Sequence, residues 1–165
     1  MRTNVNEILT KKLLNIFIKK GKKNKAIKIY SYMLFKVQLK TGKNAYDVIL
    51  NALNNIKPIV DVRDFKKGRS VFQMPYLLND YQGYKKALKW LSIVSKENKK
   101  NKMVDNFVNE LILAYEGKGS CIKKKKELYK LVSQNRHNIY MQKKKYWFII
   151  QNSWYGFKDD LLKKN

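Results

Sequence analysis

Glycine placement constrains the fold of this chain more than any other feature of the sequence. All seven glycines stand at or beside apparent boundaries between segments whose apolar residues recur at helical spacing. Gly21 and Gly42 stand one or two residues after two such segments, where a left-handed residue commonly ends a helix. The chain is therefore expected to form a series of short helices separated by tight turns.

Apolar stripes predict six helices, at residues 5–20, 24–40, 44–56, 82–96 and 103–115, with the sixth beginning near Cys121. Asn44 is placed to cap the third helix, with Asp47 three residues on, and Pro58 ends it. The predicted inward face of this third helix consists of Val48, Ile49, Ala52, Leu53 and Ile56. The sixth helix is expected to carry Leu128, Leu131, Val132 and Ile139.

Residues 59–76 break the helical period. Two short runs rich in Val, Phe and Ile flank a loop at 66–69, which predicts a β-hairpin. Pro75 is compatible with it, because both strands of an isolated hairpin are edge strands. We expect a mainly α fold, a six-helix bundle with a protruding two-stranded β-hairpin arm between helices three and four. One domain is expected at 1–140, followed by a C-terminal extension at 141–165.

The net charge of +25 points to a polyanionic partner, since 37 Lys and Arg face only 12 Asp and Glu. RNA, DNA and an anionic membrane are the three candidates. No segment has the roughly 18 continuous apolar residues of a membrane span, and we expect no membrane partner. The bias towards Lys, Asn, Ile and Tyr is typical of an A+T-rich genome and indicates an organelle or protist origin.

Four basic clusters stand out, and their number favours nucleic acid over a merely solvated surface. They lie at the first interhelical turn, at the hairpin tip, at the start of the sixth helix and at Lys143–Lys145. The predicted RNA-binding residues are Lys11, Lys12, Lys19, Lys20, Lys22, Lys23, Lys25, Arg63, Lys66, Lys67, Arg69, Lys118, Lys123, Lys124, Lys125 and Arg136. Among the aromatic residues, Tyr30, Tyr84 and Trp90 have core spacing, while Phe65 and Phe72 are open to packing or base stacking.

An active site finds little support in the sequence, and we expect neither an enzyme nor a cofactor. Cys121 and His137 are the one possible nucleophilic pair, yet sixteen residues on one predicted helix place them roughly 24 Å apart. One Cys and one His cannot form a zinc site, and no glycine-rich phosphate loop is present. The adjacent Asp159 and Asp160 are interpreted as solvated surface.

Several motifs resemble the S-seven family of small-subunit ribosomal proteins. Residues 55–63 (Asn-Ile-Lys-Pro-Ile-Val-Asp-Val-Arg) resemble the exit of its third helix and its first arm strand, and 72–75 (Phe-Gln-Met-Pro) its second strand. Colinear matches extend over about residues 5–140. The remaining matches are at 21–23, 40–42, 87–91, 109–111, 117–119, 122–125 and 135–136.

The resemblance implies six helices with a hairpin arm. It also implies binding to the 3′ major (head) domain of small-subunit rRNA, nucleation of head assembly, and a place near the tRNA exit site and the mRNA path. Expected partners are rRNA, neighbouring head and platform proteins, tRNA and mRNA, without a stable homo-oligomer. The family's basic N-terminal tail has no counterpart before residue 5, and Phe65 and Arg69 replace an arginine and a glycine of the family's arm loop.

The composition leads to an expected location in the mitochondrial matrix ribosome, with a plastid ribosome as the alternative. No leader pattern follows Met1, so an organellar protein would be organelle-encoded or already processed. The apolar run 146–150 is expected to pack on the chain's own domain, to dock on another ribosomal protein, or to be disordered. Two rival functions remain, a dimeric helix-turn-helix DNA-binding regulator and an enzyme acting on RNA.

Overall fold

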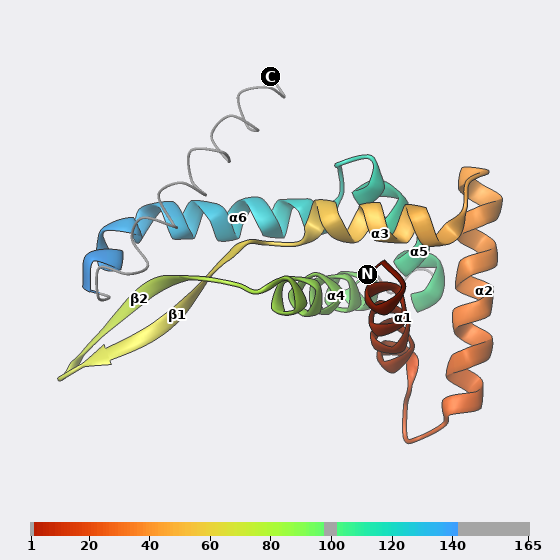
Figure 1. Cartoon of the computed structure of the whole chain (residues 1–165), viewed down its shortest axis with the longest axis horizontal. Helices are drawn as coiled ribbons and strands as arrows, with labels where there is room; N and C mark the ends of the chain where they lie inside the picture. The colour runs from red at the N-terminus through yellow and green to blue at the C-terminus, as the bar shows by residue number, and fades with distance from the viewer. Residues whose placement is uncertain (1, 98–101, 142–165) are drawn as a thin grey trace. The chain divides into compact units, whose positions relative to one another are not determined.

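A computed structural model describes residues 2–97 and 102–141 of the chain (Figure 1). The elements are α1 (Arg2–Phe17), α2 (Lys23–Thr41), α3 (Ala45–Ile56), β1 (Val60–Lys67), β2 (Ser70–Leu77), α4 (Asp80–Glu97), α5 (Met103–Tyr115), α6 (Ser120–Gln134) and a 3-10 helix η1 (Arg136–Met141). The fold is mainly α with a hairpin between α3 and α4, as predicted. Contacts divide the chain into two compact units.

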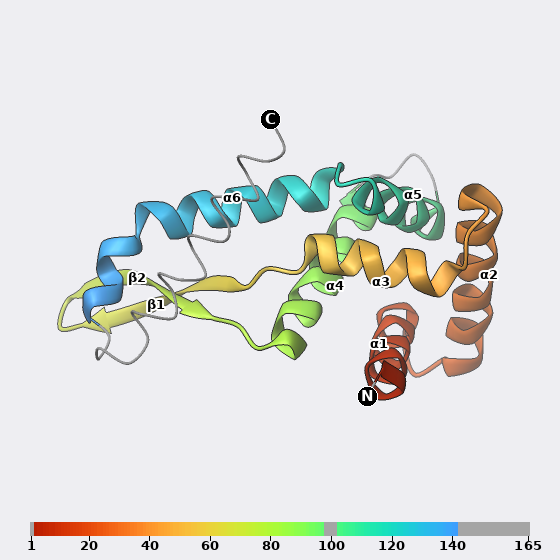
Figure 2. The ribbon, with the colours of Figure 1, turned by 45° about the horizontal axis from the view of Figure 1, so that its top comes forward.

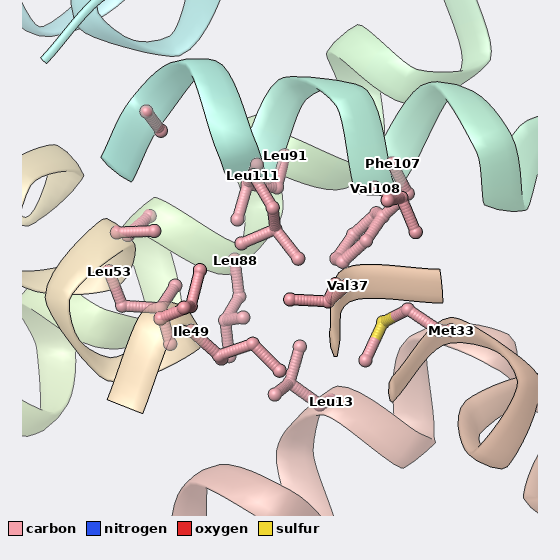
Figure 3. Close-up of a cluster of buried hydrophobic side chains, with 14 of the residues drawn as sticks. Leu13, Met33, Val37, Ile49, Leu53, Leu88, Leu91, Phe107, Val108 and Leu111 are labelled. Atoms are coloured by element: carbon pink, nitrogen blue, oxygen red, sulfur yellow. The ribbon is translucent and has the colours of Figure 1, made fainter. Parts of the chain in front are cut away.

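Unit 1 comprises residues 1–58 and 80–126 and holds the main hydrophobic core. Side chains from α1 to α5 converge on it (Figure 3). α3 packs against α2, α4 and α5, and its predicted inward stripe is fully confirmed as buried. Phe17 and Phe107 meet edge to face at 5.3 Å between ring centroids. Each fully buried side chain of this size contributes about 1.5–3 kcal/mol, so this core fixes the helices that carry the basic turns.

The helix ends around α2 follow backbone geometry. α1 stops at Phe17 and not at the predicted Lys20, because Lys20 (φ 50°) and Gly21 (φ 72°) both adopt left-handed conformations. Gly42 ends α2 as predicted, with φ 64° and its N–H donating to the Gln38 carbonyl. The predicted cap of α3 is also confirmed, since the Tyr46 N–H donates to Asn44 Oδ1 at 3.1 Å.

Unit 2 comprises residues 59–79 and 127–165, and its described part contains the hairpin, the end of α6 and η1. The strands pair antiparallel from Val60↔Leu77 to Lys67↔Ser70. The turn is therefore two residues, 68–69, and the predicted four-residue loop is wrong, because Gly68 adopts φ 60° and lets pairing continue to the tip. The base is closed by a small second cluster formed by Val60, Tyr129 and Val132.

The sixth helix ends earlier than predicted. α6 stops at Gln134, so Ile139 lies on η1 and not on the α-helix. The Asn138 N–H donates to the Asn135 carbonyl in 3-10 geometry, and the Asn138 amide donates to the Gln73 carbonyl of β2 at 2.9 Å. After Gln134 the chain therefore turns towards β2 and does not continue the α-helix. The predicted extension at 141–165 lies outside the described residues apart from Met141.

Candidate nucleic-acid interface

The α1–α2 turn gathers the first basic cluster on exposed backbone. Its five predicted lysines, at positions 19, 20, 22, 23 and 25, are all solvent-exposed. The Lys22 N–H donates to the Lys19 carbonyl at 3.1 Å, and this bond tightens the turn. No side chain caps the N-terminus of α2, where the helix dipole is positive. Ammonium groups and an open helix end together favour a phosphate.

The hairpin-tip cluster, defined as Lys66, Lys67 and Arg69, lies at the end of unit 2's strands. Lys66 and Arg69 are exposed, whereas the side chain of Lys67 lies outside the described part. Phe65, two residues before the end of β1, is also exposed, at 41%. The tip therefore presents cations beside an accessible aromatic ring, a combination suited to RNA.

Arg63 is set closer to the hairpin base. Its guanidinium lies 5.4 Å from the centroid of the Tyr76 ring, and the Tyr76 hydroxyl donates to Asp61 at 3.3 Å. Burial and the neighbouring Asp61 carboxylate raise the pKa of Tyr76, so it stays a neutral donor at physiological pH. Arg63 is exposed but oriented by this ring, which keeps it available to a phosphate.

The α6 entrance cluster divides into exposed and engaged lysines. Lys118 and Lys123 are exposed. Lys124 instead pairs with Glu97 at 3.5 Å, and Lys125 Nζ donates to the Asn55 carbonyl at the end of α3 at 2.7 Å. Lys125 thus satisfies a terminal helix carbonyl. Neighbouring lysines of this cluster therefore differ, since some are exposed and others are bonded within the fold.

A buried carboxylate positions the start of α6. Glu110 of α5 is only 7% exposed, and its Oε1 accepts the Cys121 N–H at 2.8 Å. A Cβ on Gly119 would stand 2.8 Å from the same oxygen, so this position requires glycine. Sequence reasoning missed Glu110, although a signal existed, because it lies on the apolar stripe of α5 with Phe107 and Ala114.

The remaining predicted contacts are scattered. Lys11 on α1 and Arg136 on η1 are exposed. Lys12 Nζ lies 3.8 Å from the centroid of the Tyr81 ring, and its hydrogen bond lowers the pKa of the Tyr81 hydroxyl. Lys12 therefore links α1 to α4 as well as carrying charge. The structure groups the α1–α2 turn and the α6 entrance in unit 1, and the hairpin tip and Arg136 in unit 2.

The surroundings of Cys121 are unsuited to nucleophilic catalysis. The sequence placed it on one helix with His137, which is wrong, because His137 lies on η1 beyond the end of α6. Cys121 is buried, and burial raises the pKa of its thiol far above the usual range. Over residues 2–97 and 102–141, His, Cys, Asp and Glu form no group suited to a metal ion, and no helix is long and apolar enough to span a membrane.

Comparison with known proteins supplies the family. The family model for ribosomal protein S7p/S5e matches residues 1–136. A small ribosomal subunit protein uS7 from Pelagibacter ubique is 35% identical over 131 residues, covering 79% of this chain and 84% of the relative. The Bordetella pertussis uS7 is 35% identical over 125 residues, 76% of this chain and 80% of the relative. The Rickettsia bellii uS7 is 29% identical over 140 residues, 85% and 86% respectively.

Proposed function

The chain belongs to the ribosomal protein S7p/S5e family, and we propose from this that it is a structural rRNA-binding protein of the small ribosomal subunit. Members of this family are ribosomal constituents and not enzymes. The observation that carries the proposal is the agreement between the family match over residues 1–136 and the exposed basic turn between α1 and α2. An enzyme acting on RNA would instead need a reactive centre.

We propose that the exposed cations bind rRNA phosphates by shape more than by base sequence. The first contacts are assigned to the α1–α2 turn, to Lys118 and Lys123 at the α6 entrance, and to the hairpin tip. Lys12, Arg63, Lys124 and Lys125 add charge at these surfaces while also holding intramolecular contacts. Lys11, Lys67 and Arg136 complete the proposed footprint.

The finer placement follows from the same resemblance. We propose that residues 1–140 bind the head domain of the rRNA early in assembly, beside other head and platform proteins. The hairpin tip would then lie near the tRNA exit site and the mRNA path. The Lys-rich, Asn-rich composition supports a mitochondrial ribosome, with a plastid ribosome as the alternative. The rival DNA-binding regulator has no support from the family match.

Two measurements test this function. The full chain should co-sediment with its cognate small subunit at low salt. Its affinity for a head-domain rRNA fragment should also fall steeply with salt, because each neutralised phosphate releases condensed counterions. A nearly flat plot of log affinity against log salt would refute the electrostatic footprint. Absence of the chain from small subunits sedimented at low salt would refute the ribosomal assignment.

A further inference from the structure

Helix α2 carries apolar side chains on two opposite faces. Its inner face, which includes Met33 and Val37, enters the core of unit 1 (Figure 3). On the opposite face Tyr32, Phe35 and Leu39 remain 48%, 62% and 72% exposed. Their spacing of three and four residues places them on one stripe, here called the α2 outer stripe. Figures 1 and 2 show α1, α3 and α5 all on the same side of α2.

The lysines along one border of this stripe are bound by α5. Lys36 forms a salt bridge with Asp105, and this hydrogen bond raises the pKa of the Lys36 ammonium. Four residues later, Lys40 Nζ donates to Asn109 Oδ1 at 2.6 Å, again matching a step of four on α5. Because these cations already have partners on α5, the border is less suited to phosphate than the exposed basic turns.

The stripe is also poorly suited to stacking RNA bases. Lys36 Nζ lies 4.6 Å from the centroid of the Tyr32 ring and occupies one face of it. Leu39, the most exposed member, is aliphatic and offers no π-face to a base. Exposed apolar side chains at three- and four-residue spacing instead match the seam by which one helix packs on another.

The charge of α2 indicates which side chains a partner helix must carry. α2 contains no Asp or Glu, and exposed Lys28 continues the stripe four residues before Tyr32. Within the described part of the chain, no salt bridge to Lys28 is found. A partner helix therefore fits best if carboxylates border its apolar residues, so that they can meet Lys28.

We propose that the α2 outer stripe docks an amphipathic helix of another small-subunit protein, one with aliphatic and aromatic residues at three- and four-residue spacing bordered by carboxylates. The inference rests on the proposed function, because it supposes incorporation into the small subunit. It adds a protein-binding face to a helix whose N-terminal turn is assigned to rRNA.

Photo-crosslinking identifies the occupant. A benzophenone amino acid is placed at Leu39 of the full chain, the chain is assembled into small subunits, and crosslinked products are identified by mass spectrometry. Lys89, exposed on α4, is the control position. We expect the Leu39 probe, and not the Lys89 probe, to join a peptide from another ribosomal protein with the stated pattern. Crosslinks to rRNA, to a second copy, to residues 142–165 of the chain itself, or to nothing would overturn the proposal.

A charge variant tests the energetics. Phe35→Glu combined with Leu39→Glu should lower affinity for the crosslinked protein about thirtyfold, as for loss of a binding hot spot. Asn15→Glu with Asn51→Glu adds the same charge at exposed positions on α1 and α3 and should retain that affinity. Equal losses in both variants, or none in either, would count against the stripe.

Affinity for rRNA separates this inference from the proposed function. The stripe variant should bind head-domain rRNA nearly as well as the parent. If rRNA binding falls with the protein contact, the stripe serves RNA and the docking proposal fails. If the parent itself does not bind rRNA, the proposed function fails first. The crosslinking result uses a nearly native chain, so it remains decisive if the double variant folds poorly.

Discussion

Replacing Glu110 with Met tests whether one buried carboxylate holds the α6 entrance. Met is similar in length, so little cavity should form, but the buried Cys121 N–H loses its acceptor. An orphaned buried donor costs about 1–3 kcal/mol, and loss of a negative charge at a helix N-terminus costs about 0.3–1 kcal/mol more. Relief of carboxylate desolvation offsets part of this. We expect a net loss of about 2 kcal/mol in unfolding free energy.

Two further variants separate the contributions. Glu110→Gln keeps an oxygen acceptor and loses only the charge, so it should cost less than about 1 kcal/mol. Glu116→Gln removes an exposed carboxylate next to the C-terminus of α5 and should lie within about 0.5 kcal/mol of the parent. Urea denaturation at constant slope m gives all three values. A Met variant as stable as the parent, or a Gln variant as damaged as the Met variant, would refute the capping argument.

Three further predictions follow from burial and charge. Alanine at all three hairpin-tip positions should leave the unfolding free energy within about 0.5 kcal/mol of the parent and weaken rRNA binding, whereas Val60→Asp should cost several kcal/mol in thermal unfolding because it buries a charge. Since burial raises the pKa of the Cys121 thiol, a disulfide reagent at pH 8 should react with it only after denaturation. Deleting residues 143–165 should lower stability if that segment packs on its own domain, or impair only subunit incorporation if it binds a neighbour; no effect on either would refute both.

Local sequence rules predicted helix bounds correctly where a single signal, such as an apolar stripe or a capping residue, was strong. α5 was predicted at its observed bounds, Met103–Tyr115, because its apolar stripe is long. Asn44 and Gly42 marked true helix ends because capping depends on residues within the same turn. The arm was recognised because residues 59–76 lose the helical period. The errors arose where strand pairing continues to Lys67 and where Asn138 bonds to Gln73 of β2, a residue far away in the sequence.

The tasks of individual lysines could not be predicted from the sequence. Lys124 and Lys125 stand in an unbroken run of lysines, yet one meets Glu97 and the other the Asn55 carbonyl. Those partners are far away in sequence and become neighbours only when the core has formed. Periodicity reports which face a side chain occupies, not which acceptor lies opposite it. The exposed apolar face of α2, with Tyr32, Phe35 and Leu39, was likewise not predicted from the sequence.

Some lysines are bonded within the fold and others are exposed, so the net charge of +25 does not serve RNA binding alone. Lys36, Lys40, Lys124 and Lys125 each meet an acceptor inside unit 1, so part of the positive charge stabilises contacts between helices. Phosphate binding at those positions would compete with an existing bond, whereas the α1–α2 turn presents lysines on exposed backbone. The salt slope of rRNA binding should therefore respond more to removal of Lys22 or Lys23 than of Lys124 or Lys125. Equal effects of single alanine substitutions on that slope would show that the internal contacts open when RNA binds.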